Sequence, residues 1–111
     1  MLVGTNWRLT SNGVGSFASG AAKTLRLAAN GSASGSAGCN TFRVTYSTEA
    51  NTLAFGPIAT TKKLCGAREM VLEHAYLGAL GRVHLFSIEG TRMVLLGVRG
   101  RRLLIFAGSP P

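Results

Sequence analysis

Residues 30–46, NGSASGSAGCNTFRVTY, decide the fold that we expect for this chain. The stretch begins with Asn30-Gly31, a dipeptide that favours a tight β-hairpin turn. Residues 32–38 are all Ser, Ala or Gly. Such small side chains predict a strand that another backbone or a helix can approach closely. In residues 42–46 apolar and polar side chains alternate, which is typical of a strand with one buried face. The stretch therefore predicts paired β-strands.

Towards the N-terminus, residues 6–10 and 23–27 show the same alternation. Trp7 in the first of these segments and Leu25 in the second fall on the apolar face. Residues 11–20 are rich in Ser, Gly and Ala, and this composition predicts a loop between the two strands.

Towards the C-terminus, one helix is predicted over residues 67–80, which are good helix formers without proline. Gly81 stands where a C-terminal cap belongs. The helix has an apolar stripe at helical spacing, formed by Met70, Tyr76, Leu77 and Leu80. Glu73 falls in the middle of this stripe, and a carboxylate buried there needs a partner because burying it unpaired is costly.

Short strands surround the helix in the sequence. Residues 53–55 predict one strand, which Gly56-Pro57 ends. Residues 83–88, 92–98 and 101–107 predict a final three-stranded meander. We expect the core to consist of side chains from all these elements: Trp7, Leu25, Leu27, Phe42, Val44, Phe55, Tyr76, Leu77, Leu80, Leu95 and Ile105.

The length and composition exclude several classes of protein. A chain of 111 residues predicts one domain, residues 1–111, with residues 1–5 and 108–111 expected to fray at its ends. The high hydrophobic content of 46% excludes intrinsic disorder. The chain contains no Asp, so a Ser-His-Asp triad is excluded and a Ca²⁺ or Mg²⁺ site is disfavoured. No apolar run is long enough to span a membrane.

Several motifs occur in an order and spacing that go beyond these general patterns. In chain order they are Trp7-x-Leu9, Asn30-Gly31-x-x-x-Gly35-x-x-Gly38-Cys39-Asn40-x-Phe42, Leu53-x-Phe55-Gly56-Pro57-Ile58-Ala59-Thr60-Thr61, Lys63-x-Cys65, Glu73-x-x-Tyr76-Leu77-x-x-Leu80 and a last hairpin that ends in Leu103 to Phe106. With these motifs the chain resembles the META domain, also called the HslJ-like domain, of bacterial heat-shock lipoproteins and related proteins. The resemblance covers nearly the whole chain.

The resemblance implies a mainly β (α+β) fold: a small antiparallel β-barrel or half-barrel with one α-helix near residues 67–80. It also implies a stress-associated, envelope-associated protein, with no catalytic residue to carry over. The chain departs from the family at Asn30 and at Gly97-Val98-Arg99, where Asp is common in the family. Both departures remove negative charge and weaken the transfer of any acidic ligand-binding role.

The two cysteines, Cys39 and Cys65, form the most informative pair of residues. We favour a disulfide between them, which in the loop-entropy model is worth roughly 3–4 kcal/mol and which requires an oxidising compartment. Two buried free thiols and a redox-active pair both remain open. A zinc site that combines them with His74 and His84 is disfavoured, because the usual short ligand spacings are missing. We therefore expect neither a metal nor a cofactor.

Four polar residues lie in the most family-like segments: Asn40, Thr60, Thr61 and Glu73. One interpretation is a polar ligand site beside the cysteines. The alternative, which we favour, is that Asn40 and the threonines satisfy nearby backbone groups and that Glu73 is a buried carboxylate with hydrogen-bond partners.

The net charge is +8, from 12 Lys and Arg against 4 Asp and Glu, and the cations gather in two stretches. The first group is Lys62, Lys63 and Arg68, and the second is Arg99, Arg101 and Arg102. A positive surface attracts nucleic acid or anionic lipid. The alternative is a charged surface that only keeps the protein in solution.

The function that we expect is a non-catalytic binding or scaffolding module, whose partner is another protein or a small apolar ligand in the barrel mouth. A basic module that binds nucleic acid or acidic lipid through the two cationic groups is the second interpretation. An enzyme based on Cys39 or Cys65 is the third. The expected location is the cell envelope or periplasm if a signal sequence was removed, and otherwise the cytoplasm. Pairing of an exposed strand edge with a second chain would give a dimer.

Overall fold

The structure of the chain is a computed structural model that describes residues 2–11 and 21–110. Most of the predicted loop over residues 11–20 lies outside the described residues, and Ser11 belongs to the first strand. The elements in chain order are β1 (Asn6–Ser11), β2 (Thr24–Leu27), β3 (Ser32–Ser36), β4 (Thr41–Glu49), β5 (Thr52–Phe55), β6 (Ala59–Thr60), α1 (Ala67–Leu80), β7 (Leu85–Glu89), β8 (Arg92–Leu96), the 3₁₀-helix η1 (Val98–Gly100) and β9 (Arg102–Ser109).

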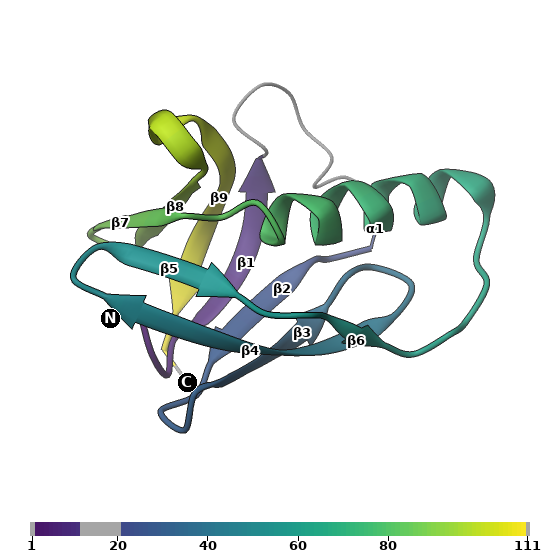
Figure 1. The fold of residues 1–111 in the computed structure, drawn as a ribbon. Coiled ribbons are helices and arrows are strands. Elements are labelled where there is room, and N and C mark those ends of the chain that lie inside the picture. The colour runs from purple at the N-terminus through teal and green to yellow at the C-terminus, as the bar shows by residue number, and fades with distance from the viewer. Residues whose placement is uncertain (1, 12–20, 111) are drawn as a thin grey trace.

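The strands are bonded in a ring, which confirms the predicted antiparallel architecture (Figure 1). The order is β3-β2-β1-β9-β8-β7-β5-β4-β6, and β3 also pairs with β4, so that the ring closes. The link between β5 and β7 is the weakest, since it rests on the single pair Thr52 and Leu85. The short strand β6 extends the sheet beyond the ring along β4.

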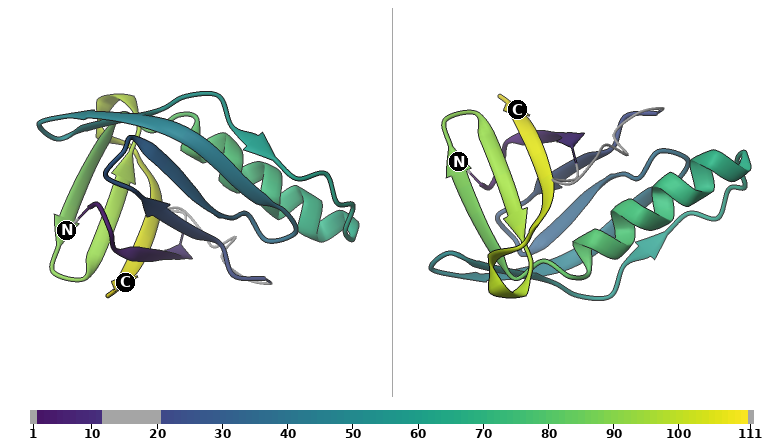
Figure 2. Two further views of the ribbon diagram at one scale, coloured as in Figure 1. Left: turned by 90° about the horizontal axis from the view of Figure 1, so that it is seen from below. Right: turned by 90° about the horizontal axis from the view of Figure 1, so that it is seen from above.

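The one α-helix in the described part of the chain, α1, has the predicted bounds, and it lies along β2, β3 and β4 (Figures 1 and 2). Tyr76, Ala79 and Leu80 are its buried apolar residues. The Tyr76 ring meets the edge of Phe42 on β4, with 5.9 Å between the ring centres. These contacts fix α1 against the sheet and place its C-terminal end beside η1.

Small residues in β3 allow the close approach that their size predicts. A Cβ atom added at Gly35 would lie 2.1 Å from the backbone oxygen of Thr24 on β2, which is far inside contact distance. The ring of Phe42 on β4 would lie 3.1 Å from this added Cβ atom. The β2 and β4 segments therefore approach Gly35 from both sides, and a larger residue would separate them.

Most of the predicted core is confirmed, with one error in β9. Of the predicted core residues, eight are buried: Trp7, Leu25, Leu27, Phe42, Val44, Tyr76, Leu80 and Leu95. Phe55 and Leu77 are partly buried and pack against that core. Ile105 was assigned to the wrong face, because its neighbours Leu104 and Phe106 point inward instead.

The error in β9 has a clear physical cause. Residues 103–106 are all apolar, so alternation does not reveal which face is buried. Pairing decides it: Phe106 lies opposite Met93 and Leu9, and Leu104 lies opposite Leu95. All three of these partners are buried.

Residues near both ends of the described chain pair with strands of the sheet. Val3 forms a bridge with Leu27, and the amide of Gly4 donates to the Leu27 carbonyl at 2.9 Å. Near the C-terminus, β9 continues to Ser109, and Gly108 lies opposite Trp7. Backbone pairing therefore orders these parts of residues 1–5 and 108–111.

Tyr76 makes the stability of the domain sensitive to alkaline pH. Its hydroxyl donates to the Thr24 carbonyl at 2.7 Å, and burial raises the pKa of Tyr76 well above 10. The neutral form is thus favoured in the folded state. The contribution of Tyr76 is complete below pH 10, and it is lost as the pH rises from 10 through the higher pKa of the folded state.

We expect Tyr76→Phe to remove this alkaline loss. Below pH 9 or so the variant should be about 1 kcal/mol less stable than the parent, because it lacks the hydrogen bond. Above pH 10 the difference should shrink, by at most about 1.4 kcal/mol per pH unit. Urea unfolding followed by the fluorescence of Trp7, the only Trp in the chain, measures both. A pH-independent difference would contradict the prediction, and Tyr46→Phe, at a partly exposed tyrosine, is the control.

Candidate functional site

Cys39 and Cys65 form a disulfide, which resolves the three alternatives left by the sequence. The bond joins the loop between β3 and β4 to the connection between β6 and α1, with the two Cα atoms 6.1 Å apart. Cys39 is half-buried and Cys65 is exposed. The bond therefore ties an exposed connection, residues 61–66, to the sheet.

Asn40 organises a hydrogen-bonded cluster directly beside the disulfide. Its backbone N–H and its side-chain Nδ2 donate to the two oxygens of Glu73, at 2.7 and 2.8 Å. Its Oδ1 accepts from the Thr61 hydroxyl and from the backbone N–H of Lys63, both at 2.8 Å. Nδ2 also donates to the Lys63 carbonyl at 3.2 Å. We call Asn40, Thr61, Lys63 and Glu73 the Asn40 cluster.

Within the Asn40 cluster, Asn40 is the hydrogen-bond partner that the buried carboxylate of Glu73 requires. Asn40 and Glu73 are 3% and 4% exposed, and the cluster joins α1 to the two loops that the disulfide links. Within residues 2–11 and 21–110, no buried side-chain nitrogen or oxygen is without a hydrogen-bond partner. Because its polar groups are already paired, the cluster is better suited to holding the fold than to binding a ligand.

Thr60, the remaining member of the predicted polar group, lies outside this cluster. It belongs to β6 and is paired with Phe42 of β4. Together with Thr41 and Arg43 it lines a small cavity of about 220 Å³ on the sheet. The structure thus brings Asn40, Thr61 and Glu73 together and leaves Thr60 apart.

Lys23 is a buried cation that the sequence analysis missed. Its side chain is 1% exposed, and Nζ donates to the Ala21 carbonyl at 3.2 Å. Burial lowers the pKa of Lys23, while the nearby carboxylates of Glu69 and Glu73 oppose this effect. A signal was present in the sequence, since alternation puts Lys23 on the same strand face as Leu25 and Leu27.

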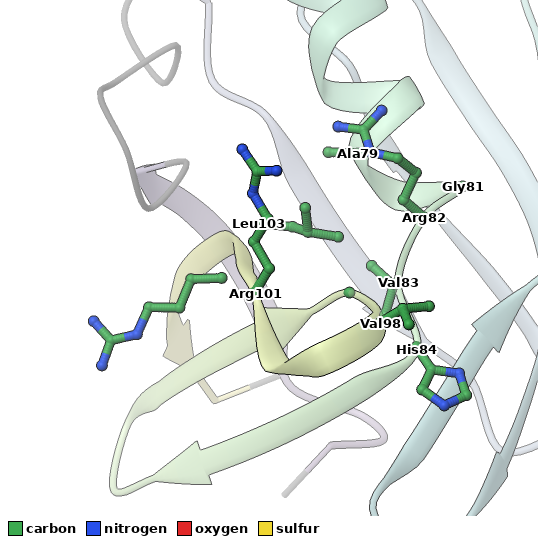
Figure 3. Close-up of a pocket in the computed structure, with 10 residues that line it drawn as sticks. Ala79, Gly81, Arg82, Val83, His84, Val98, Arg101 and Leu103 are labelled. Carbon is green, nitrogen blue, oxygen red and sulfur yellow. The ribbon is translucent and has the colours of Figure 1, made fainter.

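A pocket lies where α1 ends and η1 begins (Figure 3). Its volume is about 680 Å³, within the usual range for small-molecule sites. It is lined by apolar groups, by cations and by backbone: Ala79, Gly81, Arg82, Val83, His84, Gly97, Val98, Arg101, Arg102 and Leu103. No carboxylate is among these residues.

Three arginines, Arg82, Arg101 and Arg102, are among the lining residues and give the pocket its charge. In Figure 3 the side chains of Arg82 and Arg101 extend to the same side of the pocket, with Val83 and Leu103 near them, while His84 points away. Arg82 follows directly after the helix cap Gly81, and Arg101 follows η1. The site therefore combines an apolar lining with guanidinium groups that can bind carboxylate, sulfonate or phosphate.

The two predicted cationic groups do not form one surface. Arg101 and Arg102 line the pocket, and Arg99 lies beside it in η1 with a φ angle of 68°. Lys62, Lys63 and Arg68 lie at the other end of α1, whose 14 residues span about 20 Å. Figure 2 shows the start of α1 at one edge of the molecule and its end nearer the middle, towards η1. Arg82 and His84 carry no local sequence signal for this site, because only the fold brings them into the same pocket lining as Arg101.

Neither a metal cluster nor a membrane-spanning helix is found among the described residues. No group of three or more His, Cys, Asp or Glu side chains is arranged to hold a metal ion. Within the same residues, α1 is too short to cross a bilayer.

Comparison with known proteins gives one family and several similar folds. The sequence model of the META domain matches residues 1–110. A protein from Burkholderia xenovorans, solved by NMR, is 29% identical with a TM-score of 0.78, and the match covers 99% of this chain and 85% of that one. A DUF4847 family protein from Bacteroides vulgatus has a TM-score of 0.75 over 100% of this chain and 96% of its own, and at 11% identity it shows the fold alone. No curated protein matches the chain.

Proposed function

The chain belongs to the META domain family, and from this premise we propose that it is a non-catalytic binding domain. Its ligand is a small molecule with an apolar body and one anionic group, held in the pocket between the end of α1 and η1. This joins the two binding functions expected from the sequence, a small apolar ligand and an anion, in one site.

One observation carries this proposal: Arg82 and Arg101 share a pocket of about 680 Å³ with Val83, Val98 and Leu103. The apolar side chains favour burial of a hydrocarbon or aromatic body. The guanidinium groups favour an anion at its end, and no carboxylate lines the pocket to compete for them.

The proposal of a non-catalytic role rests on the chemistry of the same residues. The pocket is lined by arginines, a histidine and apolar groups, without a Ser, Thr, Cys, Lys or carboxylate side chain to act as a nucleophile. The two cysteines are joined to each other away from the pocket, which removes the thiolate that the enzymatic interpretation needs.

We also propose that the domain works outside the cytoplasm, at the cell envelope. Disulfides form and persist in oxidising compartments, and the Cys39–Cys65 bond supports such a location.

A matched pair of dyes tests the pocket. 1-Anilinonaphthalene-8-sulfonate has an aromatic body and a sulfonate, and N-phenyl-1-naphthylamine has the same body without the charge. We expect the sulfonate to bind about tenfold more tightly, since charge-assisted hydrogen bonds to arginine are worth roughly 1.5–3 kcal/mol. Arg82→Gln/Arg101→Gln should abolish this preference and leave the neutral dye unaffected. Fluorescence titration measures both affinities.

Two further variants make the test specific. Leu103→Asn should weaken both dyes, because it alters the apolar lining. Arg26→Gln/Arg43→Gln removes two exposed cations from strands β2 and β4, outside the pocket lining, and should change neither affinity. Equal binding of the two dyes, or an equal loss in both double arginine variants, would show that the pocket does not recognise the anion.

A further inference from the structure

We propose that the connection between β6 and α1, with Leu64 at its tip, docks the domain on an anionic lipid bilayer. This surface is separate from the ligand pocket. It consists of Leu64 with Lys62 and Lys63 beside it, and we call it the Leu64 loop.

Leu64 is presented to solvent by a segment that is held on both sides. Its side chain is 90% exposed, the highest value among the exposed large apolar residues of the described chain. On one side, the backbone N–H and carbonyl of Lys63 both bond to the Asn40 side chain. On the other side, Cys65 is joined to Cys39.

Because of these contacts, the backbone around Leu64 is already fixed before the loop meets a membrane. The Thr61 amide also donates to the Thr41 carbonyl at 3.1 Å, so that anchored residues alternate with outward-facing ones along the loop. A group already fixed in its exposed position loses less conformational freedom on association than a mobile one. The disulfide and the Asn40 cluster thus serve the Leu64 loop as well as the fold.

Charge complementarity identifies the surface that this loop fits. Lys62 and Lys63 are exposed immediately before Leu64, and the chain carries a net charge of +8. Cations near an anionic membrane surface each add binding energy, and an apolar side chain between them enters the boundary between headgroups and acyl chains. Val71, in the second turn of α1, is a further large apolar side chain at this end, 67% exposed.

A bilayer fits the shape of the loop better than a macromolecule does. One protruding leucine buries far less than the area of a specific protein interface, whereas a bilayer accepts it without a matching recess. Single-stranded nucleic acid is bound through aromatic side chains that stack on bases, and residues 61–66 contain none.

Docking through the Leu64 loop leaves the ligand pocket accessible. The pocket lies at the opposite end of α1, about 20 Å away along the helix axis. Membrane binding and dye binding are therefore independent, and either can fail without the other.

The test is co-sedimentation of the full chain with two kinds of vesicle, phosphatidylcholine alone and phosphatidylcholine mixed with phosphatidylglycerol. We expect binding to the mixed vesicles that weakens as salt is raised, and little binding to the neutral ones. Lys62→Gln/Lys63→Gln should weaken binding about 25-fold, at roughly fivefold per cation. Leu64→Asn should weaken it about tenfold, because its apolar side chain no longer enters the boundary.

The control variant carries the same loss of charge elsewhere. Arg8→Gln/Arg92→Gln, at exposed cations of β1 and β8, should weaken vesicle binding by less than about threefold, since cations away from the loop add only a screened contribution. All the variants change exposed side chains, and unchanged urea midpoints would confirm that they fold. Equal losses in the two charge variants, no effect of Leu64→Asn, or no binding to mixed vesicles would overturn the proposal. Binding to an acidic protein or to nucleic acid in place of vesicles would overturn it as well.

Discussion

Glu73→Ala is expected to destabilise the domain by about 3–5 kcal/mol, the range seen when one partner of a buried charged group is removed. Glu73 is 4% exposed and accepts two hydrogen bonds from Asn40. Without the carboxylate, the Asn40 backbone N–H keeps no acceptor among the contacts of the Asn40 cluster. A buried donor left without a partner costs about 1–3 kcal/mol by itself.

The buried Lys23 adds to the cost of this substitution. The Glu73 carboxylate stabilises the ammonium of Lys23 and so raises its pKa against the effect of burial. In Glu73→Ala the charged lysine keeps its burial and the larger effect of Glu69, but it loses the counter-charge of Glu73. The total is a large fraction of the roughly 5–15 kcal/mol by which a small domain is stable.

Urea unfolding of three variants followed through Trp7 tests the prediction. Glu73→Gln keeps one oxygen acceptor and directs an amide towards a donor, so we expect an intermediate loss of about 2–3 kcal/mol. Glu89→Gln removes an exposed carboxylate at the end of β7 and should stay within about 0.5 kcal/mol of the parent. If Glu73→Ala were as stable as Glu89→Gln, the Asn40 cluster would not be a determinant of the fold.

Loss of the Cys39–Cys65 bond is the second large effect that we expect. The bond closes a loop with a sequence separation of 26, and the loop-entropy model assigns about 3.5 kcal/mol to a loop of this length. Reduction should therefore lower the urea midpoint strongly. Intact mass before and after reduction should differ by two hydrogens, which counts the bond directly.

Cys39→Ala/Cys65→Ala separates the bond from side effects of the reductant. The variant should be as unstable as the reduced parent, and reductant should not change it further. Because the disulfide and Glu73 hold the same connection, their losses should not be additive when combined in one chain. Equal stability of the oxidised and reduced parent would contradict a structural role for the bond.

Both predictions concern the contacts that hold the connection leading into the N-terminal end of α1, and these contacts link stability to the proposed membrane contact. The Asn40 cluster and the disulfide fix residues 61–66, and Leu64 projects from the segment that they hold. At the other end, the pocket depends on the contact between the helix end and η1. The domain thus has a separate surface for each of the two proposed interactions.

The sequence by itself determined most of the secondary structure and most of the core. Alternation in residues 42–46 and helical spacing in residues 67–80 are local periodicities; the helix has the predicted bounds, whereas β4 is longer, Thr41–Glu49. The short strand β6 and the 3₁₀-helix η1 were not predicted. The motifs around Cys39 and Asn40 also identified the family, because their order and spacing are properties of the chain itself. Periodicity gave the wrong face for Ile105, because an unbroken apolar run does not show which of its side chains are buried. The pairing of β9 with β1 and β8 decides which side chains face the core.

Only the tertiary structure decided which residues from separate segments of the chain meet. The sequence left the cysteines open among three alternatives and left Glu73 without a named partner, because no local pattern reports which segments meet. It likewise could not bring Arg82 beside Arg101, since their meeting requires the end of α1 to pack next to η1. Local periodicity follows from backbone geometry, whereas disulfides, buried polar clusters and pockets arise from long-range packing, and only the folded chain shows which residues that packing brings together.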